Sequence, residues 1–228
     1  MKITNTLMLA LLFSLSSGAQ SQSMNESFDA IQKGDAVTAF IGFKKHAASG
    51  NANAQGVLGM MYANGQGVSK DYKQAIYWYG KSADQGSAQS QTYLGFMYVT
   101  GQDIPKDYKQ AMYWFRKAAD QGHAKGQFNL GIGYFDGQGV PKDYQQATYW
   151  FRKAANQGDA GAQFNLGLRY YNGEGVPKSE ETAYFWWLLA SANGLPDAIK
   201  IREIIENTLT PKQRASAQTD ARDWKPVK

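Results

Sequence analysis

The sequence contains no cysteine, only two histidines and only six prolines among its 228 residues. Without cysteine the chain forms no disulfide, no thiol nucleophile and no cysteine-ligated metal site. The two histidines, His46 and His123, have no cluster of Asp or Glu at ligand spacing around them, so we expect both to be exposed. We therefore predict no metal and no cofactor, and a fold that depends on packing alone.

Motifs of activated nucleophiles are also absent, because neither G-x-S-x-G nor S-x-x-K occurs in the chain. The adjacent acids Glu180 and Glu181 point to different faces of a helix and make a poor acid–base pair for glycoside hydrolysis. We predict no catalytic residue and no enzyme. A hydrolase of cell-wall or β-lactam amides is the alternative.

Long apolar runs are missing as well, apart from Leu7–Leu15 near the N-terminus. This stretch is too short to span a bilayer, and Ser17 and Ala19 occupy the two positions that a signal peptidase reads. We expect residues 1–19 to be a cleaved signal peptide and the protein to be periplasmic or secreted. No later segment is predicted to cross a membrane.

The formal charge of +5 is modest, and it falls to +4 if Lys2 leaves with the signal peptide. This excess indicates a weak preference for acidic surfaces and gives no reason to expect nucleic acid as a partner. The sequence gives no indication of the oligomeric state.

What the sequence does have is a repeat of 36 residues. Four positions follow this step and hold the same residue in each repeat: Leu58, Leu94, Leu130, Leu166; Tyr62, Tyr98, Tyr134, Tyr170; Ala75, Ala111, Ala147, Ala183; and Trp78, Trp114, Trp150, Trp186. Such self-similarity is typical of stacked repeats, whose apolar faces are buried only by their neighbours. We predict a degenerate half repeat over residues 20–51, four repeats over 52–197, and capping helices with a tail over 198–228.

Each repeat is predicted to form two helices, helix A and helix B, because apolar residues recur at helical spacing and no stretch alternates with a period of two. The fold class is therefore all-α. A G-x-G pair lies between the helices and not after a strand, and Lys142 stands where a third glycine would complete a dinucleotide-binding fingerprint. These glycines are interpreted as turns, with Gly137 in the left-handed conformation that ends helix A.

The residues that follow the G-x-G turn predict where helix B begins. Asp71, Asp107 and Asp143 are expected to be N-caps, and Gln74, Gln110 and Gln146 follow three residues later to complete a capping box. Asp103 replaces the second glycine of the second repeat and is expected to adopt the same left-handed backbone.

The segments AQFNLGLRYYNGEGVPK and DYKQAMYWFRKAADQG resemble Sel1-like repeats, the slightly longer relatives of tetratricopeptide repeats. The resemblance implies a right-handed α/α superhelical solenoid of helix-turn-helix repeats, here with a C-terminal helical cap. It also implies adaptor or scaffold roles in exported bacterial proteins and no reaction. Some exported relatives have one disulfide per repeat and were named for penicillin binding, but this chain has no cysteine to match them.

Comparison of the repeats separates fixed from variable positions of helix A, and the variable ones lie together on one arc. In tetratricopeptide-like arrays helix A lines the concave surface, so the resemblance implies a peptide groove. The predicted partner-binding residues are Asn53, Val57, Met60, Asn64, Gln89, Tyr93, Phe96, Lys125, Asn129, Asp136, Asn165 and Leu168. An alternative for the always-apolar position, which holds Met60, Phe96, Ile132 and Leu168, is packing against the neighbouring repeat.

Helix B contains the aromatic triplets YWY, YWF, YWF and FWW. Packing between helices is the favoured interpretation, and stacking on a carbohydrate is the alternative. Lysines at 70, 106, 142 and 178, and at 81, 117 and 153, form ridges that are expected to be solvated. The predicted function is an exported adaptor or scaffold that binds a protein or peptide in the cell envelope or outside the cell, with a glycan-binding module as a further alternative.

The C-terminal segment shows a helix start at Thr210, with Pro211 at the first helical position and Gln213 at the third. Before it, three isoleucines are predicted to share one face that covers the fourth repeat: Ile201, Ile204 and Ile205. Trp224 is expected to pack back near this cap.

Overall fold

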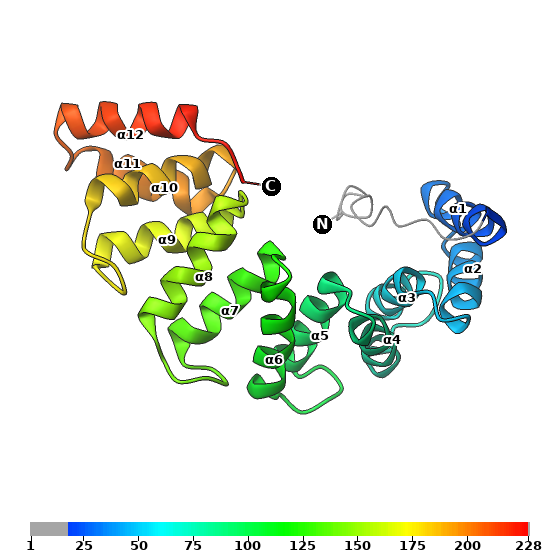
Figure 1. Cartoon of the computed structure of the whole chain (residues 1–228). Helices are drawn as coiled ribbons and strands as arrows, with labels where there is room; N and C mark the ends of the chain where they lie inside the picture. The colour runs from blue at the N-terminus through cyan, green and yellow to red at the C-terminus, as the bar shows by residue number, and fades with distance from the viewer. Residues whose placement is uncertain (1–17, 228) are drawn as a thin grey trace. The chain divides into compact units, whose positions relative to one another are not determined.

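The computed structural model describes residues 18–227, with side chains from residue 24 onward (Figure 1). The described part is all-helical, with twelve helices and no strand, which confirms the predicted fold class. The predicted signal peptide over residues 1–19 lies almost entirely outside the described residues.

The helices follow the 36-residue register. The A helices are α3 (Ala52–Asn64), α5 (Ala88–Thr100), α7 (Ala124–Asp136) and α9 (Ala160–Asn172). The B helices are α4 (Tyr72–Asp84), α6 (Tyr108–Asp120), α8 (Tyr144–Asn156) and α10 (Glu180–Ala192). Before them lie α1 (Gly18–Gln32) and α2 (Ala36–Ala48), and after them α11 (Pro196–Glu206) and α12 (Pro211–Asp223).

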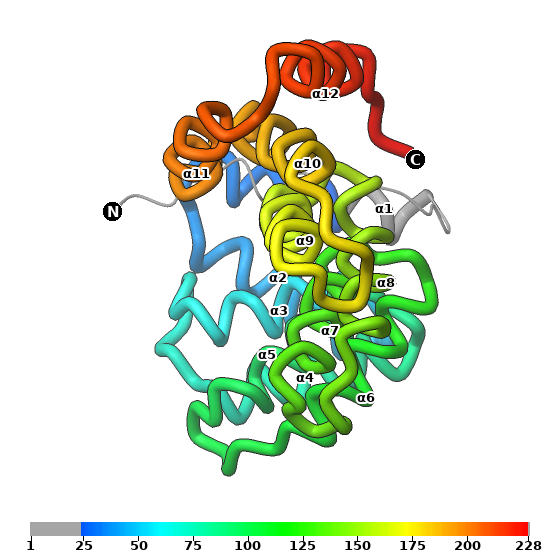
Figure 2. The backbone as a smooth tube through the Cα atoms, turned by 90° about the vertical axis from the view of Figure 1, so that its left-hand side faces the viewer, coloured from blue at the N-terminus to red at the C-terminus, as the bar shows by residue number. Residues whose placement is uncertain are grey.

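The chain forms two compact units, and each is described by itself. Unit 1 comprises the chain up to Leu94 together with Gln102–Ile104, and unit 2 comprises Gly95–Gly101 and the chain from Pro105 onward. Helix α5 contributes to both. Within unit 2 the helices α7, α9 and α10 stack in chain order, as both backbone views show (Figure 2).

The turn from helix A to helix B has the predicted backbone. Gly137 ends α7 with φ of 73°, and its N–H donates to the carbonyl of Gly133. Asp103 has φ of 58°, the only positive φ of a non-glycine residue in the described part of the chain. Both are left-handed conformations that glycine and aspartate tolerate.

The B helices begin at the predicted N-caps, but the capping box is only half formed. The side chain of Asp143 accepts hydrogen bonds from the backbone N–H groups of Gln145 and Gln146. The reciprocal bond to the glutamine side chain does not form, because the N–H of Asp143 already donates to the carbonyl of Tyr134, at 2.9 Å. The equivalent backbone bonds join Asp71 to Tyr62 and Asp107 to Tyr98.

A glycine in each A helix allows close packing against an aromatic ring of helix B. A Cβ added to Gly131 would lie 2.7 Å from a ring carbon of Phe151, which is fully buried. The equivalent glycines Gly59 and Gly95 face Tyr79 and Phe115 in the same way. A side chain at any of these three glycines would therefore clash with the facing ring.

Buried glutamines connect consecutive helices. Gln163 of α9 is fully buried, and its Nε2 donates to the carbonyl of Ala155 near the end of α8, at 3.2 Å. Its Oε1 accepts a hydrogen bond from Nδ2 of Asn193, which follows α10, at 3.0 Å. One side chain therefore links the ends of three successive helices. The same arrangement recurs in two earlier A helices. In α3, Gln55 bonds to the carbonyl of Ala47 and to the side chain of Gln85. In α7, Gln127 bonds to the carbonyl of Ala119 and to the side chain of Gln157.

The two ends of the described chain differ in part from expectation. Residues 20–51, predicted as a half repeat, hold the two helices α1 and α2. The predicted capping box at Thr210 and Gln213 is confirmed. Ile205 is buried as predicted, but Ile204 is 69% exposed and does not cover the fourth repeat, because α11 turns only part of its isoleucine face toward α10.

Replacing Gln163 by leucine tests the buried links. The change removes the hydrogen bond from Gln163 to the carbonyl of Ala155 and the one from Asn193 to Gln163, so we expect the free energy of unfolding of unit 2 to fall by about 1 kcal/mol or more. Urea unfolding of Gln163→Leu beside Gln145→Leu, which changes an exposed glutamine, measures the effect. Equal midpoints for the two variants would contradict the proposed role.

Candidate functional site

The predicted binding residues occupy four register positions of helix A: the second, sixth, ninth and thirteenth. These positions recur at intervals of four, three and four residues, which places them on one helix face. We call this face the A-helix strip. The boundary between the units divides it, with the positions up to 93 in unit 1 and those from Phe96 onward in unit 2.

In unit 1 the strip is partly closed by packing. Val57 is 2% exposed and belongs to the hydrophobic core, so its assignment as a partner-binding residue is wrong. A partner of the folded protein has no access to this side chain. Met60 is half-buried against the same core, whereas Asn53 is half-buried and Asn64 is exposed.

The part of the strip on α5 that belongs to unit 1 contains Gln89 and Tyr93, both half-buried. The ring of Tyr93 stacks on that of Tyr79, with 5.2 Å between centroids. Tyr79 is itself buried, so Tyr93 also contributes to the packing of unit 1. A change at Tyr93 therefore affects stability as well as the surface.

In unit 2 the ninth position of the strip forms an apolar series. Phe96 is 52% exposed, whereas Ile132 and Leu168 are half-buried against the cores around α8 and α10. The packing alternative is therefore right for Ile132 and Leu168, and for Met60 in unit 1, but not for Phe96. Ile204 of α11 extends the series, because it lies 36 residues after Leu168 and is exposed.

Ile204 was not predicted to be part of this surface. The signal was present in the 36-residue step, which places α11 in the register of a fifth A helix. Its isoleucines were instead interpreted as a face that covers the fourth repeat.

Polar groups flank the apolar series in unit 2. Asn129 and Asn165 donate from Nδ2 to the carbonyls of Lys125 and Gly161, one turn earlier, at 2.7 and 2.9 Å. These bonds fix each side chain on the helix surface and use only its donor group. Asp136, at the end of α7, is exposed.

Lys125 has a structural partner. Its Nζ lies 2.7 Å from the carboxylate of Asp159, whose side chain is 4% exposed. Asp159 is the N-cap of α9 and accepts a hydrogen bond from the N–H of Ala162. Lys125 therefore neutralises a buried carboxylate between α7 and α9, in addition to any contact with a partner.

The two histidines are not exposed, contrary to expectation. His46 is buried in α2, where it lies in the last turn of the helix. His123 is half-buried and is the N-cap of α7, with Nδ1 accepting from the N–H of Gly126 at 3.3 Å. Burial holds the pKa of His123 below its usual value, and the charge of Lys125 lowers it further.

The pKa of His123 predicts a pH dependence of stability. A histidine with a lowered pKa in the folded state stabilises the fold fully above its unfolded pKa of about 6.5, and the benefit is lost as the pH falls toward the folded value. Protonation also removes the acceptor of the N-cap, worth roughly 1 kcal/mol.

The variant His123→Asn isolates this effect, because Asn51 shows that asparagine caps the equivalent helix without titrating. We expect the free energy of unfolding of the wild type to fall relative to the variant between pH 7.5 and pH 5. Urea unfolding of both proteins at each pH measures the difference. A constant difference across this range would show that His123 does not cap α7.

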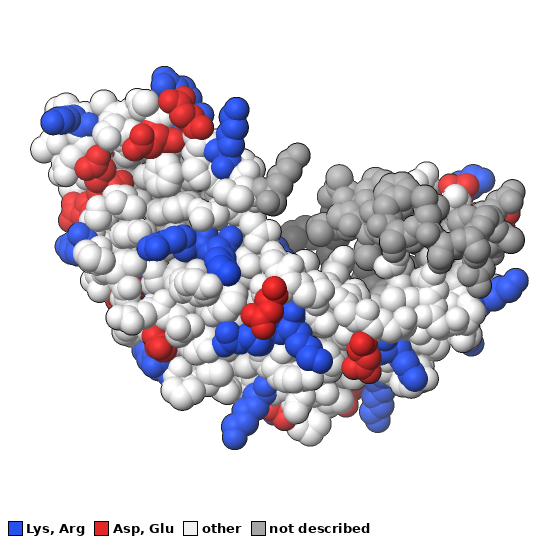
Figure 3. All heavy atoms as spheres, viewed as in Figure 1, with Lys and Arg blue, Asp and Glu red and all other residues white. Residues whose placement is uncertain are grey.

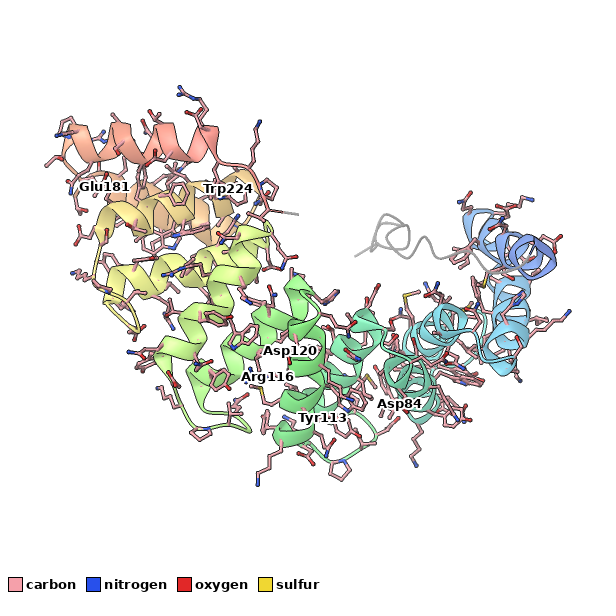
Figure 4. All side chains as sticks on the ribbon, in the orientation of Figure 1. Asp84, Tyr113, Arg116, Asp120, Glu181 and Trp224 are labelled. Carbon is pink, nitrogen blue, oxygen red and sulfur yellow. The ribbon has the colours of Figure 1, made fainter. Side chains whose placement is uncertain are left out.

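The aromatic triplets of helix B divide into three environments. The third ring, as in Phe151, is fully buried against helix A, and the second, Trp150, is buried against α6 and α7. The first ring, Tyr149, is about half exposed, with Nζ of Lys153 4.9 Å from its centroid. Tyr113, which is labelled on α6 in Figure 4, is also about half exposed. Nζ of Lys117 lies 4.8 Å from the centroid of its ring. Packing therefore explains two of the three rings.

Charged side chains do not gather into one patch on the face that Figure 3 shows, where acidic and basic residues alternate over the surface. Within residues 18–227, no group of three or more His, Asp or Glu side chains is arranged to hold a metal ion. None of the described helices is long and apolar enough to cross a membrane.

Comparison with known proteins identifies the repeat. The model of the Sel1 repeat matches residues 52–87, 88–123, 124–159 and 160–195. These four matches follow the 36-residue step from residue 52, and the last one ends at residue 195. No curated protein sequence matches the chain.

Two solved structures are similar in both sequence and fold. A protective antigen present in uropathogenic Escherichia coli strains, which displays an SLR fold, is 37% identical with a TM-score of 0.82 over 90% of this chain. This chain spans only 45% of that protein. A Sel1 repeat protein from Oxalobacter formigenes is 29% identical with a TM-score of 0.76, covering 92% of this chain and 87% of the other.

Proposed function

The chain belongs to the Sel1-repeat family, and we propose that it is an exported scaffold that binds a protein or peptide partner on the A-helix strip. Sel1-repeat proteins are generally protein–protein interaction scaffolds and are typically not enzymes. The strip, the partner's location in the cell envelope or outside the cell, and export itself are the parts of the proposal that go beyond family membership.

The observation that carries the proposal is the apolar series of unit 2. Phe96 and Ile204 are large, apolar and more than half exposed, at the register position that Ile132 and Leu168 occupy between them. Exposed apolar side chains that recur in register are a feature of interaction surfaces. The flanking polar residues Asn129 and Asn165 supply oxygen acceptors that suit the backbone N–H groups of a bound peptide.

Photo-crosslinking tests where the partner binds. A photoreactive phenylalanine analogue at position 96 is expected to capture the partner in cells, whereas the same analogue at position 113, an exposed tyrosine of helix B, is expected not to. The captured protein is then identified and purified for binding measurements with the variants below.

We expect Phe96→Ala with Asn129→Ala to weaken binding of that partner by about tenfold or more, because exposed aromatic side chains at the centre of an interface contribute most of the binding energy. The melting temperature is expected to change little, since neither side chain belongs to the buried core. Tyr93 is left unchanged, because its ring stacks on Tyr79 and its loss would weaken packing as well as binding.

The matched control is Tyr113→Ala, which removes an exposed ring from helix B. A different result would place the site on the ridge of Lys70, Lys106, Lys142 and Lys178. In that case the Phe96→Ala, Asn129→Ala variant binds normally, and Lys106→Ala with Lys142→Ala binds more weakly.

Export has its own test. The apolar stretch before Ala19 supports cleavage after that residue, so the protein produced in a bacterial host is expected to begin at Gln20 and to fractionate with the periplasm or medium. The variant Leu11→Arg is expected to block export, because the arginine interrupts the apolar stretch. A full-length protein that stays in the cytoplasm would contradict the proposal.

A further inference from the structure

A groove of about 500 Å³ lies between α10 and α12 of unit 2. One wall is the face of α10 that carries Glu181 and Phe185, and the other is the face of α12 from Ala217 to its end at Trp224. Glu181 and Trp224 are separated along the two helices, as their labels show in Figure 4. The groove is distinct from the A-helix strip, since neither α10 nor α12 is an A helix.

The floor of the groove is apolar and held in place. Phe185 packs edge-on against Trp186 with 4.9 Å between ring centroids, and both Phe185 and Trp224 pack on the core of α8 to α10. The segment after Trp224 returns to α8, where the N–H of Val227 donates to the carbonyl of Asn156 at 2.8 Å. This contact fixes the chain beside Trp224, so the aromatic end of the groove exists before any ligand binds.

The rim of the groove is acidic. It carries Glu181, Asp220 and Asp223, and no lysine or arginine lines the groove. Asp223 pairs with its neighbour Arg222 at 3.0 Å, but Glu181 and Asp220 form no ion pair within the described part of the chain. The chain as a whole is basic, with a formal charge of +5, so this local excess of negative charge runs against the composition.

We propose that the groove between α10 and α12 binds a cationic peptide segment of a partner protein, in which lysine or arginine side chains flank apolar ones. The apolar side chains lie on Phe185 and Trp224, and the cations lie against the carboxylates of Glu181 and Asp220. A cation beside Trp224 is also attracted by the face of the indole ring. Charge complementarity fixes the class of ligand, because an acidic segment would be repelled by the unpaired carboxylates of Glu181 and Asp220.

Calorimetric titration of the full chain tests the proposal with a defined probe, an end-capped pentapeptide in which three lysines alternate with two leucines. We expect saturable 1:1 binding at low salt that weakens as the salt concentration rises, since exposed charges are screened. The same peptide with glutamates in place of the lysines is expected not to bind.

Two variants locate the binding. Glu181→Gln with Asp220→Asn removes both unpaired charges while preserving side-chain size, and is expected to weaken binding of the lysine peptide by about tenfold or more. Asp120→Asn, which removes an exposed acid at the end of α6, is the matched control and is expected to bind as the wild type does. Unchanged melting temperatures confirm that each variant is folded.

The proposal is overturned if the lysine peptide shows no saturable binding below about 1 mM, if the glutamate peptide binds equally well, or if the double variant binds like the wild type.

Spermine provides a last distinction, because it carries charge without apolar side chains. If spermine binds as tightly as the peptide, the groove recognises a polyamine and not a peptide. The Phe96→Ala, Asn129→Ala variant is expected to bind the lysine peptide normally, so failure of either proposal can be told apart from failure of the other.

Discussion

The hydrogen bonds of the buried glutamines are the constraint on which the stack depends. An apolar interface between helices tolerates small sliding, but a buried amide that loses its partners destabilises the fold by about 1–3 kcal/mol. Gln127 must reach the carbonyl of Ala119 and the side chain of Gln157 at once, at 3.3 and 2.8 Å. These two contacts fix an A helix against the end of the preceding B helix and against the end of its own. The 36-residue step in the sequence is therefore also a step in hydrogen bonding.

Most of the fold could be predicted from the sequence because its signals are local. The N-cap of Asp143 and the left-handed backbone at Gly137 depend on neighbouring residues only, and both are present as predicted. The missing half of the capping box could not be predicted, because it depends on which carbonyl the N–H of Asp143 meets after folding, and that carbonyl belongs to Tyr134 in the preceding helix.

The candidate site was less predictable for a related reason. Variation between repeats marks positions that stacking does not dictate, but it does not measure exposure. Val57 varies with its equivalents and is nevertheless buried, because unit 1 packs its own side chains around that position. Phe96, Ile132 and Leu168 share one register position and differ in exposure, since the depth of each depends on the side chains of the adjacent B helix. The sequence pattern located the A-helix strip, and tertiary packing decided which of its members are accessible.

Variation inside the core shows how a repeat can change without losing its register. Arg169 is buried at a position where other repeats have Met61 and Gly133, and it lies 3.1 Å from Glu174 and over the ring of Phe135. Burial lowers the pKa of Arg169, and the charge of Glu174 raises it, so the pair offsets the removal of the guanidinium from water. The carbonyl of Glu174 also accepts from the hydroxyl of Thr148, at 3.0 Å. One polar substitution in the core therefore anchors the turn between α9 and α10, while the glutamine links of the same repeat remain intact. The links maintain the register, and this leaves turns and surface strips free to differ from repeat to repeat.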